Sequence, residues 1–213
     1  MKNKIILIFT AYVSLFVVGL VSCGDDCDGP FYSKYKTIDL DWHNYRVNYA
    51  PNSNTNLILR EIEDNAVLYK EYSIFIKPEQ VFYANQNSTG RKFDLIHAAY
   101  ACDPVVIATT VEKIDSIVIS STKDFNESHR AGANLSDLFD VVVRDNSNNY
   151  SKKNYNLNDY LALKPLVPNE LTLILNEQPQ ATTDFEFLVK FYQKGVDKSY
   201  FEFLTNRIVI QRE

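Results

Sequence analysis

Hydrophobic and polar residues alternate with a period of two over much of this chain. Large apolar residues occupy every second position from 185 to 191 and recur at 201 and 203. Between the two runs lies the segment 194–197, in which Gly195 can take the positive φ that a tight bend requires. Because a period of two belongs to strands with one buried face, the pattern predicts a β-hairpin here and a further strand at 208–210.

Shorter stretches of the same kind predict four more strands: 72–78, 93–101, 113–120 and 171–175. The first of them is closed by Pro78, which cannot donate to a strand ladder. Helical signals are brief. Asn134 could cap a helix over 135–139 and Asn158 one over 159–161, and neither reaches three turns. Several short strands with almost no helix predict an all-β fold, a single β-sandwich of the immunoglobulin-like type.

The first 22 residues are predicted to be a targeting signal and not part of the fold. Lys2 and Lys4 precede an apolar region, and no charge occurs in the 17 residues from Ile5 to Val21. A basic start, an apolar stretch and small residues before a cleavage site make a secretory signal. A transmembrane anchor is one alternative, but a helix needs about 20 apolar residues to cross a bilayer. An ordinary cleaved signal is another, although it needs no cysteine after the cut.

Cys23 directly follows this stretch, and Leu20-Val21-Ser22-Cys23 resembles the lipobox of bacterial lipoproteins. The resemblance implies that residues 1–22 are removed and that Cys23 carries the lipid, with acyl chains such as palmitate. Each buried CH₂ group adds about 0.8 kcal/mol of anchoring. The acidic segment 24–28 resembles the surface-export signal of Bacteroidota lipoproteins, and a solvated tether is the simpler interpretation. We expect an outer-membrane protein that faces the cell exterior, with the periplasmic face as the alternative.

Cys27 and Cys102 are the other two of the three cysteines. In a protein that leaves the cytoplasm, an even pair of cysteines indicates a disulfide. Such a bond would close a loop of about 75 residues. By lowering the entropy of the unfolded chain, it would raise the free energy of unfolding by about 4 kcal/mol. A metal or redox site is the alternative, but the chain has no Cys-x-x-Cys motif and no histidine at ligand spacing from either cysteine. We predict that Cys27 and Cys102 are bonded.

Domain organisation follows from what lies after the signal. No internal repeat and no Pro- or Ser-rich linker divides the mature chain. We therefore expect a lipidated acidic tether over 23–34 and one β-sandwich domain over 35–213, with a division near Asp103-Pro104 as the alternative. The formal net charge is −5, and removing residues 1–22 takes away two lysines and no acid. An acidic protein argues against nucleic acid as a partner and predicts repulsion from anionic lipid.

A wider resemblance runs through the mature chain. Besides the lipobox and Cys27, it rests on four segments: Ala99-Tyr100-Ala101-Cys102, Glu112-Lys113-Ile114, Asp124-Phe125-Asn126 and residues 131–139. Together these resemble uncharacterised Bacteroidota lipoproteins that share a domain of unknown function. The resemblance implies a single β-rich domain at the cell envelope. It supplies no activity, no cofactor and no catalytic residue.

The sequence carries no familiar catalytic motif. His43, His97 and His129 are the only histidines, and the chain contains no GxSxG, HExxH or Gly-rich phosphate loop. Pairs of acids are numerous, but glycoside cleavage depends on their separation in space, which spacing along the chain does not give. Asp39 and Asp41, for example, would share one exposed face of a strand. We therefore expect no enzyme, no cofactor and no metal site.

Trp42, Tyr45 and Tyr49 form the densest aromatic group of the chain, interleaved with polar residues. Aromatic rings stack on sugar rings, so these three are the candidate ligand-binding residues. The other interpretation, which is the commoner role in a sandwich, is that they fill the core or cover its rim. We predict a non-catalytic binding or accessory module with a glycan or protein ligand. The alternatives are a structural subunit of an outer-membrane complex and, with least support, a hydrolase.

Overall fold

The computed structural model describes residues 31–49, 57–83, 106–144, 155–195 and 199–213. The chain divides into two compact units, and nearly all of these residues belong to the larger one, which comprises residues 34–85 and 108–213. We call this larger unit the body. The lipobox, the acidic tether up to residue 30, the predicted strand 93–101 and all three cysteines lie outside the described residues.

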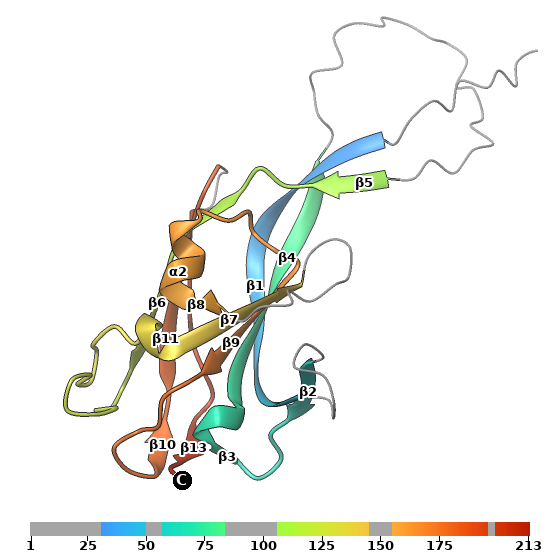
Figure 1. Ribbon diagram of the computed structural model, residues 1–213. Helices are drawn as coiled ribbons and strands as arrows, with labels where there is room; N and C mark the ends of the chain where they lie inside the picture. The colour runs from blue at the N-terminus through green and yellow to red at the C-terminus, as the bar shows by residue number, and fades with distance from the viewer. Residues whose placement is uncertain (1–30, 50–56, 84–105, 145–154, 196–198) are drawn as a thin grey trace, which may run out of the picture. The chain divides into compact units, whose positions relative to one another are not determined.

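The body is an all-β sandwich, as the alternating pattern predicts (Figure 1). Its strands, with the described residues of the smaller unit included, are β1 (Phe31–Tyr49), β2 (Leu57–Glu61), β3 (Ala66–Leu68), β4 (Tyr72–Tyr83), β5 (Val106–Thr109), β6 (Lys113–Ser121), β7 (Phe139–Arg144), β8 (Tyr155–Asn156), β9 (Glu170–Leu175), β10 (Thr183–Phe185), β11 (Phe187–Lys194), β12 (Tyr200–Leu204) and β13 (Ile208–Gln211). Within the described ranges the only α-helix is α2 (Leu157–Ala162), and short 3-10 turns occur at Tyr69–Glu71 and Ser136–Leu138.

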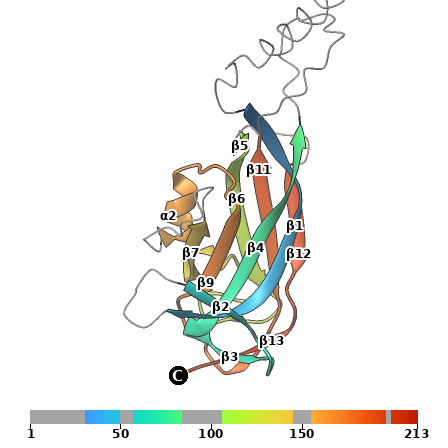
Figure 2. The same ribbon diagram turned by 90° about the vertical axis from the view of Figure 1, so that its right-hand side faces the viewer.

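Two layers of strands face each other in the body. The first is a seven-stranded sheet with the order β2-β1-β4-β9-β7-β8, in which β5 also pairs with β1. The second contains the sheet β12-β11-β6, and a further small sheet has the order β10-β13-β3. Figure 2 shows β1, β4 and β9 crossing in front of β6, β11 and β12. The immunoglobulin-like type remains a prediction.

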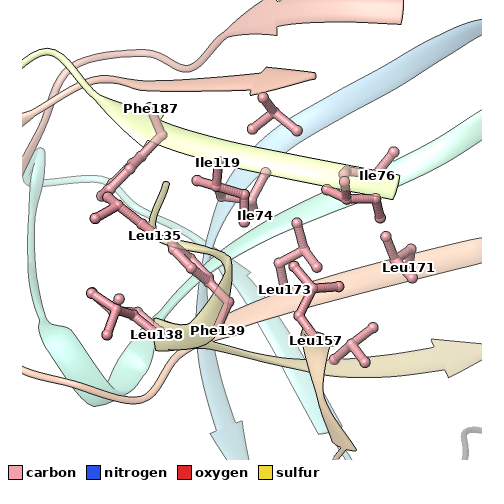
Figure 3. Close-up of a cluster of buried hydrophobic side chains, with 14 of the residues drawn as sticks. Ile74, Ile76, Ile119, Leu135, Leu138, Phe139, Leu157, Leu171, Leu173 and Phe187 are labelled. Atoms are coloured by element: carbon pink, nitrogen blue, oxygen red, sulfur yellow. The ribbon is translucent and has the colours of Figure 1, made fainter. Parts of the chain in front are cut away.

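The core lies between these layers and contains large apolar side chains from both. Phe187 of β11 is fully buried, and its ring lies 5.4 Å from Tyr72 and 5.8 Å from Phe139. Ile74 and Leu173 of the first layer lie near Ile119 of the second (Figure 3). Each side chain buried in this way contributes about 1.5–3 kcal/mol to folding. The shared core makes the two layers one packed structure.

The predicted hairpin near the C-terminus is confirmed. β11 and β12 pair in antiparallel register, and Gly195 has a φ of +108°. The predicted strand end at Pro78 is wrong, because β4 continues to Tyr83. The ladder between β4 and β9 ends at Ile76, so Pro78 lies opposite a strand on one side only and its missing N–H removes no bond to β9.

The predicted helix caps are partly correct. α2 is capped by Asn156 and not by Asn158: the Asn156 side chain accepts a hydrogen bond from the Asn158 N–H at 3.0 Å. Asn134 does accept a hydrogen bond from the Ser136 N–H, at 3.1 Å, but it opens only a single 3-10 turn. In both cases the asparagine side chain accepts a hydrogen bond from the backbone N–H two residues later, which is why asparagine is favoured where a helical turn begins.

A buried carboxylate joins the two layers near the start of β1. Glu112 is fully buried, and its two oxygens lie 3.0 and 2.9 Å from the Thr37 nitrogen, whose N–H they share. Oε2 also accepts from the Thr37 hydroxyl at 2.6 Å, and Oε1 from the Gln193 amide at 3.4 Å. A bulge at Ile38 shifts the register between β1 and β4 next to Thr37. We call this arrangement the Glu112 clasp.

Candidate functional site

A polar hollow of about 290 Å³ lies on the surface where β1 passes the loop between β12 and β13. Three segments that are distant in the sequence line it, near β2 and β13 in Figure 2. The lining residues are His43, Asn44 and Tyr45 of β1, Glu61, Ile62 and Asn65 around the end of β2, and Asn206, Arg207 and Ile208. Most of these side chains are planar polar groups. We call this site the polar hollow.

Asn44 is held in place by two hydrogen bonds. Its Nδ2 donates to the Asn206 carbonyl at 3.0 Å, and its Oδ1 accepts from the Tyr72 hydroxyl at 3.1 Å. Burial raises the pKa of the Tyr72 phenol well above its ordinary value, so this hydroxyl remains a donor throughout the physiological range. The wall of the polar hollow that Asn44 forms is therefore fixed by the body and does not depend on a ligand.

The loop over 205–207 is tied to β11 through Thr205. The Thr205 N–H donates to the Phe187 carbonyl at 2.9 Å, and the Thr205 hydroxyl accepts from the Phe187 N–H at 2.8 Å. Opposite this loop, Asn65 has a φ of +48°, a conformation that asparagine adopts more readily than most residues. Its carbonyl accepts from the Val209 N–H at 2.8 Å. Both loops that line the polar hollow are thus anchored to strands.

Arg207 brings a positive charge to the edge of the polar hollow. Its Nε lies 3.4 Å from Asp184 and its Nη2 lies 3.8 Å from Glu186, while 67% of its side chain is exposed. The Lys123 ammonium, which is bonded to Asp184, holds the pKa of that carboxyl below its usual value. Asp184 therefore stays ionised to a lower pH than an ordinary aspartate, and its charge lies beside Arg207, whose exposed guanidinium keeps donors for a ligand.

Tyr45 gives the polar hollow an aromatic ring. The ring packs edge-on against Phe75, with centroids 5.7 Å apart, and lies 5.9 Å from the imidazole of His43. His43 in turn lies 3.1 Å from Asp41, and both side chains are about half exposed. The ring is thus oriented by neighbours on one side and remains partly accessible on the other.

A second hollow, of about 440 Å³, adjoins the first through Glu61, which lines both. Its other lining residues are Arg46, Asn48, Arg60, Glu63 and Asp64. Arg46 donates from Nη2 to the Ala66 carbonyl at 3.1 Å and lies 3.5 Å from Glu71, so it too is oriented by the body. The two hollows together form an extended polar surface.

The structure separates the aromatic residues that the sequence groups together. Trp42 and Tyr45 lie on opposite faces of β1. Trp42 points between the layers and stacks on Phe203 of β12, with centroids 5.0 Å apart and planes within 6°. This matches the interpretation of Trp42 as part of the core rim. Tyr45 lines the polar hollow, and Tyr49 pairs with Leu57 in the ladder, while its side chain lies outside the described residues.

Sequence reasoning missed Glu61, Asn65, Asn206 and Arg207. Asn65 and Asn206 lie in polar turns between strands, and that is the one local signal they carry. The contact that brings Asn44 to Asn206 joins residues 162 positions apart, which no local pattern reveals. Cys23, Cys27 and Cys102, which carry the predictions of lipidation and of a disulfide, lie outside the described residues.

Two of the histidines contact acids. His43 lies 3.1 Å from Asp41, and His129 lies 3.2 Å from Asp137 and 3.1 Å from Asn126. The His129 contacts hold the loop before β7, in which the His129 carbonyl also accepts the Phe125 N–H at 2.8 Å. In the part of the chain that the structure describes, no three His, Cys, Asp or Glu residues are placed to hold a metal ion.

Comparisons with protein-family models, with curated proteins and with solved structures find no match to this chain. Among the described residues, no helix has both the length and the apolar character needed to cross a membrane.

Proposed function

We propose that this protein is a lipid-anchored, non-catalytic binding module of the cell envelope, and that its ligand is a glycan held in the polar hollow. The observation that carries the proposal is the chemistry of the lining. Every sugar hydroxyl both donates and accepts hydrogen bonds. The Asn44 amide, which two hydrogen bonds hold in place, the Asn206 amide, the Glu61 carboxylate and the Arg207 guanidinium together supply both roles.

Tyr45 adds an aromatic ring on the face of β1 opposite to the Asn44 side chain, and such a ring covers the apolar C–H face that a sugar has besides its hydroxyls. Typical pockets for apolar small molecules have volumes of about 300–1,000 Å³ and mainly hydrophobic walls. The polar hollow is near the lower end of that range and mostly polar. Because Glu61 connects it to the second hollow, the combined surface favours an extended, hydroxyl-rich chain over a compact apolar ligand.

The location part of the proposal rests on the lipobox and on the direction of β1. The predicted tether over 23–34 enters the body within β1, just before Tyr35, and Asn44 lies nine residues beyond Tyr35. At about 3.3 Å per residue, this places the polar hollow about 30 Å along β1 from the point of entry. A ligand site that far from the anchored end suits a module that faces away from its membrane. We favour the cell exterior, with the periplasmic face as the alternative.

Glycan binding is tested by titrating the purified protein with maltohexaose, xylohexaose and mannohexaose and recording heats of binding. We expect at least one of them to bind, and Asn206→Ala and Tyr45→Ala to weaken that binding by about tenfold or more, since each removes a contact group. Tyr192→Ala is the matched control, because Tyr192 is a half-buried tyrosine of β11 that lines neither hollow. Binding to none of the three sugars, or equal loss in all three variants, would contradict the proposal.

The anchor is tested separately by fractionation. Cys23→Ala should release the protein from membranes, because it removes the residue that the lipobox predicts to be lipidated. Ser22→Ala keeps a small residue before Cys23 and should leave the protein in the membrane fraction. A Cys23→Ala protein that remains there would show that residues 5–21 hold it instead. Protease added to intact cells, with lysed cells as the control, then distinguishes the exterior from the periplasmic face.

A further inference from the structure

Three large apolar side chains project from the body close to the start of β1. Leu163, Leu166 and Val111 are 68%, 52% and 46% exposed. Two hydrogen bonds join their segments: the Ile114 N–H donates to the Pro165 carbonyl at 2.9 Å, and the Val167 N–H donates to the Glu112 carbonyl at 3.0 Å. We call Val111, Leu163 and Leu166 the apolar tip.

The pairing of these two segments places lysines around the apolar tip. Lys113 lies directly opposite Leu166 in an antiparallel bridge, so the two side chains share a face, and the exposed Val111 lies two residues before Lys113 in the chain. Lys164 lies between the two leucines in the chain. Within the described ranges, neither Lys113 nor Lys164 forms an ion pair.

Nearby acids offset only part of this charge. Glu112 lies next to Lys113 in the chain, but its side chain is fully buried in the clasp. Asp115 is exposed, but Lys194 pairs with it. Lys194 itself lies opposite Lys113 in the ladder between β11 and β6. Asp159 of α2 is exposed one helical turn before Leu163, so with Lys113 and Lys164 it leaves the surface around the apolar tip with a small positive charge, although the chain as a whole has a net charge of −5.

We propose that the apolar tip is a second membrane contact, in which Leu163 and Leu166 enter the interfacial region of a bilayer while Lys113 and Lys164 meet anionic lipid headgroups. Exposed leucines surrounded by lysines are the side chains that segments lying in a membrane interface use. Lysine close to a negatively charged leaflet is attracted over about a Debye length, so the local charge decides the contact and not the net charge.

This contact rests on the lipid anchor of the proposed function, because the anchor brings the apolar tip within reach. The Glu112 clasp holds Thr37 near the start of β1, and the Glu112 carbonyl accepts from Val167 next to Leu166. The apolar tip and the point where the tether enters the body are therefore close. The segment 23–34 spans about 40 Å at most when extended.

One lipid anchor makes a weak second contact effective, because the tethered body has a high local concentration at the surface. A tether of this length confines the body near the bilayer, and the apolar tip needs little affinity of its own. The contact would also orient the body, with the polar hollow about 20 Å away along β1 and directed away from the lipid.

The test measures the depth of single tryptophans in the anchored protein. The full chain is expressed in a bacterium that processes lipoproteins, purified from membranes and placed in vesicles of phosphatidylcholine and phosphatidylglycerol with brominated acyl chains. Leu163→Trp reports the apolar tip. Leu204→Trp is the matched control, because Leu204 is an apolar side chain with 46% exposure near the polar hollow. The native Trp42 provides a common background.

We expect bromine to quench Leu163→Trp by about half and Leu204→Trp by less than about a tenth, as insertion of only the apolar tip requires. Adding Lys113→Glu to Leu163→Trp should reduce the quenching at least twofold. Adding Lys77→Glu, the same charge change on β4, should leave it unchanged. Equal quenching at positions 163 and 204, or none at 163 in protein retained by vesicles, overturns the contact alone. Protein that does not stay with vesicles at all overturns the anchor, and the contact with it.

Discussion

Two regions of β1, around Thr37 and around Asn44, lie in opposite kinds of surroundings, and we call them the two ends of the part that crosses the body. Near Thr37 a carboxylate is buried in the Glu112 clasp, and the large side chains of the apolar tip are exposed. Near Asn44 the arrangement is reversed: amides, a carboxylate and a guanidinium line an open hollow, and the aromatic ring of Tyr45 is partly covered by Phe75. One strand therefore connects an end with apolar surface to an end with polar surface.

The two ends differ in how much of their hydrogen-bonding capacity is left unused within the body, and not in the number of their polar groups. Glu112 Oε2 accepts from Thr37, and Oε1 accepts from Thr37 and Gln193, so the carboxylate uses its capacity within the body. Arg207, with 67% of its side chain exposed, keeps donors that face solvent. A buried polar group that is fully bonded stabilises and specifies the fold, whereas exposed hydrogen-bonding capacity is available to a ligand. The first end therefore supports the fold, and the second end carries the proposed recognition.

The largest expected effect is on the core that both ends share. Phe187→Ala should lower the free energy of unfolding by about 3–5 kcal/mol, because a fully buried ring is lost and a cavity remains. The measurement is urea unfolding followed by circular dichroism and by Trp42 fluorescence. Phe203→Ala, at the half-buried rim, is the matched control and should cost less than half as much. Two separate transitions in the wild-type protein would show that the ends fold independently.

The next effect separates the two ends. Glu112→Ala should lower the free energy of unfolding by about 2–3 kcal/mol, because the Thr37 N–H and the Gln193 amide lose their acceptor in a buried place. Glu61→Ala, an exposed glutamate of the polar hollow, should change it by less than about 0.5 kcal/mol. Both values come from denaturant unfolding. Equal costs for the two glutamates would remove the distinction between a supporting and a ligand-facing carboxylate.

A smaller effect is expected at the bend before β12. Gly195 has a φ of +108°, and a Cβ there would lie 3.0 Å from the Val111 carbonyl oxygen. Gly195→Ala should therefore destabilise the protein by about 1–2 kcal/mol through strain and contact with backbone. Gly132→Ala is the control: Gly132 also has a positive φ, but nothing lies within 4 Å of an added Cβ. Its cost, measured by thermal unfolding, should be the lower of the two.

The parts of the fold that the sequence predicts are those set by neighbours in the chain. The hairpin of β11 and β12 follows from alternating residues and from Gly195, and β9 follows from a short apolar run. Pro78 misleads because proline interrupts a ladder only where its N–H would have been used, and pairing with β9 has already ended there. That depends on the strand order, which local pattern does not contain.

The candidate site is predicted only in part for the same reason. Tyr45 is named from the sequence, but the grouping with Trp42 fails because a strand sends residues three apart to opposite faces. The partners that define the ends are distant: Thr37 and Glu112 are 75 positions apart, and Asn44 and Asn206 are 162 apart. These contacts depend on how the layers pack, so the Glu112 clasp and the polar hollow emerge from the structure alone.

The smallest expected effect concerns the charge at the edge of the polar hollow. Lys123 lowers the pKa of Asp184 below its usual value, so the ionised carboxylate stabilises the fold. Because the folded pKa is the lower one, this contribution is present above the ordinary aspartate pKa and is lost as the pH falls through the folded pKa. Lys123→Met should raise the Asp184 pKa in a carboxyl NMR titration. Lys190→Met, whose partner is Glu202, should not.

The same titration bears on recognition, because Asp184 also lies 3.4 Å from Arg207. Protonation of Asp184 removes the negative charge that orients this guanidinium, so sugar binding in the polar hollow should weaken over the pH range in which Asp184 titrates. In Lys123→Met that weakening should begin at a higher pH, in step with the Asp184 pKa. A binding curve that does not move with the Asp184 pKa would mean that Arg207 takes no part in recognition, and the polar hollow would then depend on Asn44, Asn206 and Tyr45.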